Sequence, residues 1–559
     1  MTSSGATRSL QSLLRLWLKF SDANRFDDAT WKPGGVQEQK LLQIVRRNQA
    51  TVYGGEKRFD RIRSVKDFQA RVPINDYDTL SPYIERSLSG EGNVLTADEP
   101  VMFARTSNTT GSAKFIPVPP SYLEEYSHGV HIHTYRMFTD YRDILEGTVL
   151  VPAYSDATGH SESGVPYGAI SGYLARKQPR SIRRFYSLPH EIAKIGRPDT
   201  KLYVTLLYAL ASDVRLIAVP TPASLILMAD KMREHAGDLI EDIRRGSISP
   251  TFAEGAPPGM AAGLHADARR ADVLQGIVSS TGRLLPAEAW PNLRLLSCWK
   301  GANMSLYLRR LPDYYGDCPV RDLGYMASEG RGATPLVNSG CGGVLNISSH
   351  FFEFVPEGDY GRPDAEFLTC DQLESDHEYF VYFTTSAGLY RYDIKDVVRV
   401  VDFYRNTPVI QFVRKGQGIT SLTGEKLTES QVTDALLEVV DRHAFDVNHL
   451  TACAEWSEPP RYALYAELGD SMTRERRELF LREFDRALRT RNLLYHAYQE
   501  QKLLGPPVLK PVASGTYEEL RRARVAQGAA EAQVKIPQLS TDMSFGDRLE
   551  VLEEIELTS

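Results

Sequence analysis

The chain contains little cysteine, and none of it is spaced in pairs. Only five of its 559 residues are cysteines, and they are scattered without a CxxC spacing. Disulfide scaffolds and zinc sites both require paired or closely spaced cysteines. We therefore expect neither, and a reducing cytoplasm is the simplest location for such a protein.

Long hydrophobic runs are also absent, and no apolar stretch reaches the length that crosses a bilayer. Residues 10–20 (LQSLLRLWLKF) carry Arg15 and Lys19 inside an apolar run, without a small-residue cleavage site. This pattern predicts an amphipathic helix rather than a signal peptide. The sequence predicts a soluble protein with no membrane partner.

An excess of positive charge is lacking too. Lys and Arg number 65 against 72 Asp and Glu, which gives a net charge of −7. This mild acidity argues against nucleic acid as a partner. With 42% hydrophobic and 25% charged residues and no internal repeat, the composition is that of an ordinary globular protein. Its length exceeds one ordinary core, so two or more domains are expected.

The hydrophobic pattern predicts an α/β fold. The first hundred residues read as helices, including residues 36–49. From about residue 147, short apolar runs typical of strands alternate with helical patterns, which favours sheets covered by helices. Strand-like runs with few helices between them then predict a more antiparallel, barrel-like subregion. These runs are residues 343–355, 379–385, 396–403 and 409–413.

A domain boundary is predicted at residues 414–418. Beyond it, we expect a helix at 427–442, a hairpin at 451–468 and a charged helix at 475–491. Glycines on both sides of Gln417 supply the backbone freedom of a hinge. The predicted domains are residues 1–414 and 415–559.

The stretch 106–114 (TSNTTGSAK) is rich in small hydroxyl residues and ends in a lysine. Hydroxyls, main-chain N–H groups and the lysine can surround a phosphate chain. The stretch is not a Walker loop, because the second glycine and the Gly-Lys-Ser/Thr ending are missing. An ordinary turn between two strands is the alternative.

A second motif is residues 325–330 (YMASEG), in which Tyr325 can stack on a purine and Glu329 can hold Mg²⁺. The alternative is a strand end with an exposed acid.

A third motif is residues 388–398, where alternation places Asp396 at the start of an apolar strand. A carboxylate there can accept both ribose hydroxyls. A solvated hairpin is the alternative, with Asp393 and Lys395 facing water. Near the C-terminus, Lys535 by itself reads as a surface residue.

Taken in order, these motifs resemble the adenylate-forming superfamily of acyl-CoA synthetases and luciferase. More specifically, the chain resembles the acyl-acid amido synthetases, known from plants as the auxin-responsive Gretchen Hagen proteins, which also have bacterial members. The likeness covers most of the chain. Further matching stretches are residues 49–55 (QATVYGG), 72–74 (VPI), 82–86 (PYIER) followed by 90–91 (GE), 290–312 (beginning WPN), 314–316 (YYG) and 403–414 (FYRNTPVIQFVR).

The resemblance implies a fold and a reaction. The fold would be a large N-terminal domain of helix-flanked sheets with a distorted β-barrel, and a smaller, mobile α+β C-terminal cap, with ATP between them. A carboxylic acid would attack the α-phosphorus of ATP to give an acyl-adenylate and pyrophosphate. An amine, typically of an amino acid, would then displace AMP and form an amide.

The resemblance also assigns roles residue by residue. Tyr325 would stack on adenine, Gly301 would pass its backbone nearby, Ser328 would contact the nucleotide, and Glu329 would hold Mg²⁺. Asp396 would bind ribose beside Arg414 at the hinge. The residues that would face the phosphates are Ser107, Asn108, Thr109, Thr110, Gly111, Lys114, Lys426 and the late Lys535, which would reach the α-phosphate. An acyl pocket is expected from residues 122–137, 154–173, 205–224 and 349–354.

The sequence departs from the family pattern at three places. Asn108 stands where the hydroxyl loop usually has glycine, although Asn tolerates left-handed backbone angles. Ala327 replaces a serine of the Tyr-x-Ser-Ser-Glu motif, and Asp393 and Lys395 replace the Arg and Gly of the plant form. The residues assigned to metal, ribose and α-phosphate are all present.

An ATP-dependent acyl-acid amido synthetase is therefore the leading hypothesis, with ATP and Mg²⁺ as cofactors. An acyl ligase that transfers to coenzyme A or a carrier-protein thiol is the alternative among enzymes. A non-catalytic nucleotide-binding protein is the alternative from another class. The sequence leaves the acid, the amine and the oligomeric state open, and a monomer is compatible with it.

Overall fold

The chain divides into two compact units in a computed structural model. The model describes residues 22–106, 114–152, 155, 157–257, 259–301, 304–416, 419–420, 422–423, 425, 427–500, 502–526 and 534–557. The larger unit comprises residues 1–300, 309–394 and 399–411, and the smaller unit comprises 301–308, 395–398 and 412–559. The amphipathic helix predicted at 10–20 lies outside the described residues, and the boundary at 414/415 and the mobility of the C-terminal part stay predictions.

The larger unit begins with helices, as the sequence predicted. Helix α3 (Pro33–Arg47) starts with a proline, whose fixed φ suits the first turn, and it buries Leu41, Ile44 and Val45 on one face. The other helices of this part are α2 (Asn24–Ala29), α4 (Val52–Glu56), α5 (Val65–Arg71) and α6 (Tyr77–Leu88).

A small sheet with strand order β2-β1-β5-β4 follows. Its strands are β1 (Met102–Thr106), β2 (Lys114–Val118), β4 (Gly159–His160) and β5 (Pro166–Gly168). The long helix α7 (Pro120–Asp140) starts directly after β2 and buries Tyr122, Glu125 and Gly129. Helices α8 (Ile170–Lys177) and α9 (Arg180–Arg183) come after β5.

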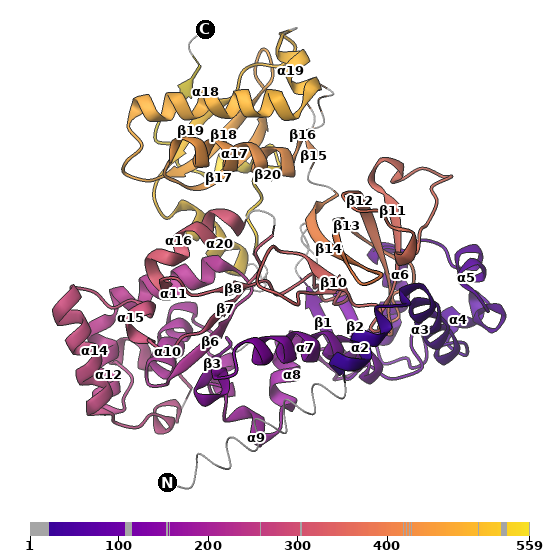
Figure 1. The fold of residues 1–559 in the computed structure, drawn as a ribbon, viewed down its shortest axis with the longest axis horizontal. Coiled ribbons are helices and arrows are strands. Elements are labelled where there is room, and N and C mark those ends of the chain that lie inside the picture. Colours follow the sequence, from indigo (N-terminus) through magenta and orange to yellow (C-terminus); the bar gives the residue numbers. More distant parts are fainter. Residues whose placement is uncertain are drawn as a thin grey trace. The chain divides into compact units, whose positions relative to one another are not determined.

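The next sheet is parallel throughout, with the order β3-β6-β7-β8. Its strands are β3 (Thr148–Leu150), β6 (Val214–Ala218), β7 (Leu295–Ser297) and β8 (Val320–Arg321). Helices gather around it in Figure 1, chiefly α10 (Pro198–Leu210), α11 (Pro222–Glu234), α12 (Ala236–Arg245) and α14 (Ala268–Thr281). Because parallel strands end at one edge, the segments that follow β7 and β8 emerge side by side.

A six-stranded sheet has the order β11-β12-β13-β14-β10-β9. Its strands are β9 (Ala333–Thr334), β10 (Gly343–Leu345), β11 (Phe351–Pro356), β12 (Glu378–Thr384), β13 (Tyr392–Tyr404) and β14 (Thr407–Lys415). The antiparallel pairing β11/β12 and β10/β14 agrees with the prediction, whereas the single run 343–355 is divided between β10 and β11. The order is linear, so closure into a barrel stays a prediction.

The smaller unit is α+β. Its five-stranded sheet has the order β20-β17-β18-β19-β21, and the predicted hairpin is β17 (Val447–Glu455) with β18 (Arg461–Leu468). The predicted helices are α17 (Glu429–His443) and α18 (Arg474–Arg491). Their apolar faces pack into one core, which includes Leu436, Leu464 and Phe484. The remaining elements are α19 (Leu493–Glu500), α20 (Thr516–Ala526), β15 (Ile419–Thr420), β16 (Leu427–Thr428), β19 (Val508–Val512), β20 (Leu539–Ser540) and β21 (Ile555–Glu556). The mixed α/β fold class is therefore confirmed.

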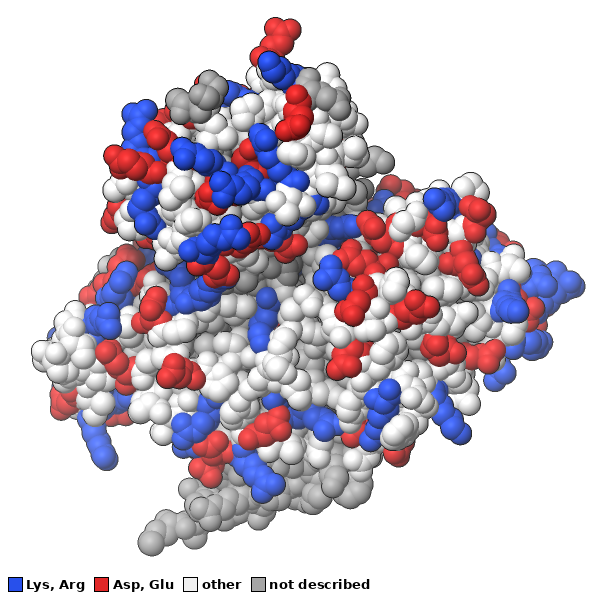
Figure 2. Space-filling model, turned by 45° about the horizontal axis from the view of Figure 1, so that its top comes forward, with Lys and Arg blue, Asp and Glu red and all other residues white. Residues whose placement is uncertain are grey.

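The surface carries charges of both signs. Figure 2 shows Lys and Arg interspersed with Asp and Glu over the visible face. No helix among the described residues combines the length and the apolarity needed to cross a membrane. All five cysteines are free thiols.

A buried ion pair joins α5, β11 and the start of β13. The Arg391 guanidinium donates to Glu353 Oε2 at 3.0 Å and to the carbonyl of Val72 at 2.9 Å. Both charged side chains are buried, at 6% and 1% exposure. Arg391 has a left-handed φ of 47°, which a residue with a Cβ adopts only where its surroundings hold it.

We expect Arg391→Met to destabilise the larger unit by about 3–5 kcal/mol, because it leaves the buried Glu353 carboxylate without its cation. Urea unfolding, followed on the transition of the larger unit, measures this. A double Arg391→Met/Glu353→Leu variant should recover part of the loss. Arg399→Met is the matched control, since Arg399 lies on β13 directly after the segment of Arg391 and pairs with Glu378 at the surface, a pair worth at most about 1 kcal/mol. Equal losses in both single variants would contradict the role of the buried pair.

Candidate active site

The predicted site residues divide between the two units. Lys114, Tyr325, Ser328 and Glu329 belong to the larger unit. The smaller unit contains Gly301, Asp396, Arg414 and Lys535. Ser107, Asn108, Thr109, Thr110, Gly111 and Lys426 lie outside the described residues, so their roles stay predictions.

Residues 325–331 form a tight turn on one β-bridge. Met326 pairs with Arg331, and the Ala327 N–H donates to the Gly330 carbonyl at 2.8 Å. Ser328 and Glu329 are partly exposed at the tip of this turn. A carboxylate in this position can reach a ligand while the bridge holds its main chain.

The ring of Tyr325, the first residue of this turn, is buried, at 8% exposure. It packs against Phe383, with ring centroids 6.0 Å apart. A Cβ on Gly332 would come within 2.4 Å of the Tyr325 ring, so glycine is required for this packing. Stacking of Tyr325 on adenine stays a prediction.

A buried carboxylate, Asp322, joins the segments that follow β7 and β8. Its Oδ2 accepts the Lys300 N–H and its Oδ1 accepts the Gly324 N–H, both at 2.6 Å. Gly324 has φ +88°, and a Cβ there would lie 2.3 Å from the Ala333 carbonyl. The main chain at Lys300 is thereby held at a fixed spacing from Gly324, which directly precedes Tyr325. Burial raises the pKa of Asp322 to about 6, against the two N–H groups.

Lys114 and Glu329 each act on a tyrosine of the larger unit. The Lys114 ammonium lies 5.2 Å from the centre of the Tyr77 ring. Tyr392 is buried, and its pKa is raised by burial first and by the Glu329 charge next, with Tyr77 also contributing.

Asp396 is buried on β13, at 3% exposure. The strand begins at Tyr392 rather than at Asp396 and continues through Lys395, which has a left-handed φ of 59°. The Lys395 carbonyl accepts the Gly416 N–H at 2.7 Å, which ties β13 to the end of β14. Asp393 does not simply face water, since it accepts the Tyr360 hydroxyl at 2.8 Å. Arg414 is buried on β14.

Lys535 is exposed in the segment between α20 and β20. Its ammonium lies 5.5 Å from the centre of the Phe412 ring, and its carbonyl accepts from Arg524 at 2.9 Å. Burial raises the pKa of Glu429, and the Lys535 charge acts against that shift. The lysine is thus presented at the surface of the smaller unit, with an acid nearby.

Sequence reasoning missed some of the residues that shape the turn. It did not identify Asp322, although an Asp two residues before a glycine is a turn signal. It placed 122–137 and 349–354 in an acyl pocket without connecting Tyr122 or His350 to the turn. Those contacts join residues far apart in the chain, so no local pattern reveals them.

The turn suits a magnesium ion bound through phosphates. Such an ion takes one or two protein carboxylates and fills its other positions with phosphate and water oxygens. Glu329 offers one partly exposed carboxylate, and in the described part of the chain no three His, Cys, Asp or Glu side chains gather as a complete metal cage. His128 and His131 both face Asp22, at 3.6 and 2.5 Å.

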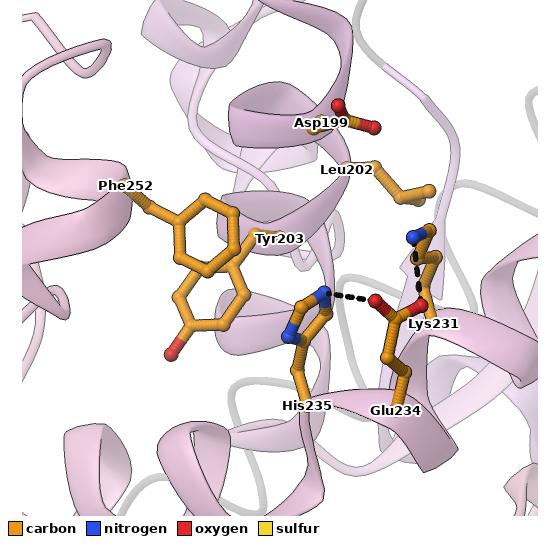
Figure 3. A pocket seen from close by; sticks show the side chains of 7 residues that line it. All are labelled: Asp199, Leu202, Tyr203, Lys231, Glu234, His235 and Phe252. Atoms are coloured by element: carbon orange, nitrogen blue, oxygen red, sulfur yellow. Dashed lines mark hydrogen bonds and ion pairs between the residues drawn. The ribbon is translucent and has the colours of Figure 1, made fainter.

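A cavity of about 150 Å³ lies elsewhere in the larger unit (Figure 3). Its wall includes Tyr203, stacked on Phe252 with centroids 3.9 Å apart. The charged groups at its rim pair with each other, since Glu234 contacts Lys231 at 2.7 Å and His235 at 3.5 Å. None of the predicted site residues lines it.

We expect the buried Asp322 carboxyl group to make the stability of the folded protein depend on pH. Its pKa of about 6 in the folded state exceeds the ordinary 3.8, so between these values the folded state holds the extra proton. Wild-type stability should therefore fall as pH rises from 4 to 7, by up to about 3 kcal/mol from this group, at about 1.4 kcal/mol per pKa unit. In Asp322→Asn this contribution is absent, so the melting temperature of the wild type should fall relative to that of the variant as pH rises from 4 to 7. Thermal melting of both proteins across that range measures this. A constant gap between them would contradict the assignment.

Comparison with known families identifies the chain along most of its length. The model for the GH3 family N-terminal domain matches residues 22–320. The models for the GH3 family central and C-terminal domains match residues 343–415 and 429–544.

Individual proteins agree with this result. The 4-substituted benzoates-glutamate ligase GH3.12 of Arabidopsis thaliana is 26% identical over 556 residues, which cover 94% of this chain and 96% of that protein. The solved GH3.15 acyl acid amido synthetase has the same fold, with a TM-score of 0.84 and 21% identity over 96% of this chain and 97% of that one. A 2-hydroxyisobutyryl-CoA ligase with bound acyl-adenylate is more distant, at a TM-score of 0.55 and 15% identity over 93% and 90% of the two chains. The chain belongs to the GH3 family.

Proposed function

We propose that this chain is an ATP-dependent acyl acid amido synthetase. It activates a carboxylic acid as an acyl-adenylate with release of pyrophosphate, and then joins the acyl group to an amino acid with release of AMP. The observation that carries this proposal is the alignment, over nearly the whole length of both chains, with a ligase named for joining benzoates to glutamate. The candidate site supports it, because Glu329, Asp396 and Lys535 are all present.

In the first half-reaction, a carboxylate oxygen bonds to the α-phosphorus while the bond to pyrophosphate breaks. Two anions must meet, so the negative charge has to be neutralised where it develops. Lys114 and the hydroxyl loop 107–111 are proposed to bind the phosphates, with Tyr325, Ser328 and the Gly301 main chain at the nucleoside. Glu329 would hold Mg²⁺, which when bound supplies further positive charge to the phosphates.

The residues of the smaller unit complete the proposed set. Asp396 would accept the ribose hydroxyls, with Arg414 beside it on the neighbouring strand. Lys426 and Lys535 would add positive charge at the phosphates, Lys535 at the α-phosphate. We further propose that residues 415–559 act as a mobile cap, because an acyl-adenylate hydrolyses readily and must be kept from water.

In the second half-reaction, the amino nitrogen bonds to the acyl carbon, the bond to AMP breaks and the nitrogen loses a proton. Holding both partners in line contributes up to about 7–11 kcal/mol of the barrier reduction in favourable cases. The acyl pocket is proposed from residues 122–137, 154–173, 205–224 and 349–354, whose aromatic and apolar side chains suit a hydrophobic or aromatic acid.

Mass spectrometry tests the reaction directly. The purified chain is incubated with ATP, Mg²⁺ and mixtures of carboxylic acids and amino acids. We expect amide products whose formation requires both partners, together with AMP and pyrophosphate. Omission of the amino acids should leave only slow pyrophosphate release.

The likeness to a CoA ligase makes a thioester-forming enzyme the second candidate. Coenzyme A added in place of the amino acids separates the two. Turnover that occurs only with a thiol would reject the amide-forming proposal, and no pyrophosphate release with any acid would reject both.

We expect Lys535→Ala to slow pyrophosphate release by about 10²–10³-fold, the usual loss when one charge-stabilising donor is removed. ATP affinity and thermal stability should stay close to wild type, because the side chain is exposed. Lys57→Ala is the matched control, since Lys57 also lies 5.5 Å from an aromatic ring centre, that of Tyr53. Unchanged pyrophosphate release in Lys535→Ala would refute its role.

A further inference from the structure

Two stacked rings hold the main chain on both sides of Glu329. The Tyr122 hydroxyl donates to the Ser328 carbonyl at 2.7 Å, and the Arg331 N–H donates to His350 Nε2 at 3.2 Å. The Ser328 carbonyl belongs to the peptide group whose nitrogen is that of Glu329. The rings of Tyr122 and His350 are fully buried and stack with centroids 5.7 Å apart at 23°. Any movement of this ring pair therefore moves the backbone that presents the Glu329 carboxylate.

The hydrogen bonds determine which nitrogen of His350 carries the proton. Because Nε2 accepts from Arg331, the proton must be on Nδ1, which faces Glu125 Oε2 at 3.3 Å. Burial lowers the pKa of His350, while Glu125 opposes this shift and the charges of Lys40 and His128 add to it. The ring is thus held neutral, in one tautomer and one orientation.

Glu125 fixes that orientation through a complete set of donors. Its two oxygens accept from Lys40 Nζ at 2.8 Å, from His350 Nδ1, from the Ser386 N–H at 3.1 Å and from the Ser386 hydroxyl. Burial by itself would raise the pKa of Glu125, but His350 and Lys40 outweigh it and lower the pKa. The ionised carboxylate therefore ties α3 and the turn at 385–389 to the ring that supports residues 328–331.

The backbone of His350 is fixed as well. Gln37 of α3 donates through Nε2 to the carbonyls of Ile347 and His350, both at 2.6 Å. Its Oε1 accepts the Phe352 N–H at 2.8 Å. Neither the ring nor the main chain of His350 can shift without breaking buried hydrogen bonds, each costly to leave unmade.

We propose that Tyr122 and His350 are positioning residues for Glu329, and that Glu125 and Lys40 keep His350 in the orientation this task requires. The inference rests on the proposed function, in which Glu329 holds Mg²⁺ on ATP. Side chains that orient a metal ligand without touching the metal tune its affinity, and their loss typically costs about 10–100-fold. Tyr122 and His350 act on the peptide groups around the ligand rather than on its carboxylate.

Calorimetric titration of ATP at increasing Mg²⁺, without any acid, measures the effect apart from activity. We expect Tyr122→Phe to raise the Mg²⁺ concentration needed for half-maximal ATP binding by about tenfold, and His350→Leu by up to about a hundredfold. His350→Gln should lie between wild type and His350→Leu, because its amide oxygen can still accept the Arg331 N–H. Glu329→Gln removes the proposed Mg²⁺ ligand itself, so it should give the largest increase in the Mg²⁺ concentration that ATP binding requires. In pyrophosphate release at limiting Mg²⁺, kcat should fall.

Tyr315→Phe is the matched control. Tyr315 is buried and donates to the Leu225 carbonyl at 2.8 Å, so it loses the same kind of hydrogen bond away from the turn. We expect a similar change in melting temperature but wild-type Mg²⁺ dependence. Wild-type Mg²⁺ dependence in folded Tyr122→Phe would overturn the inference, and this variant decides the question if His350→Leu does not fold. If the wild type binds ATP with Mg²⁺ but no carboxylic acid supports pyrophosphate release, the proposed function alone is rejected. The binding data still test the positioning in that case.

Discussion

The geometry around Glu329 depends on one buried carboxylate, that of Glu125. An ionised carboxylate in the protein interior is stable only when cations and hydrogen-bond donors replace the water it has lost. Lys40, His350 and Ser386 supply them, from three segments that lie far apart in the chain. Because the carboxylate needs all of these donors at once, their positions are coupled. Helix α7 thereby acts as a fixed reference for α3 and for the segments next to β11 and β12.

A second buried carboxylate, that of Asp322, joins main-chain segments at the edge of the parallel sheet. Asp322 accepts main-chain N–H groups from the segments after β7 and β8, where ligands commonly bind in α/β sheets. Glycine is required at 324 and 332 for the packing there. A Cβ on Gly324 would overlap the Ala333 carbonyl, and a Cβ on Gly332 would overlap the Tyr325 ring. The turn at 325–331 is consequently rigid in its main chain, while Glu329 at its tip stays accessible. Such an arrangement can present one carboxylate to a phosphate-bound metal without building a metal cage. A CoA ligase shares this fold, and a fold by itself does not determine the acceptor.

Local patterns predicted much of the secondary structure. The period of the apolar residues predicted α17 and α18, and the prolines at 459 and 460 marked the turn of the β17–β18 hairpin. The same patterns placed the start of β13 too late, at Asp396 instead of Tyr392, because Asp393 and Lys395 break the alternation of apolar residues. Lys395 also adopts a left-handed φ, which no pattern of polarity reveals. The run 343–355 was read as one segment, although it is divided between two strands that lie apart in the six-stranded sheet.

The sequence by itself determined the family and the identity of the candidate site residues, because those residues occur in short motifs whose order along the chain is distinctive. It also determined that the fold is α/β, since the hydrophobic periods are local properties. Only the tertiary structure decided how the motifs are held. Tyr122 contacts Ser328 across 206 positions of sequence, and Glu125 contacts Ser386 across 261. These contacts follow from which buried polar groups must find partners once the core is packed, and that requirement exists only in three dimensions.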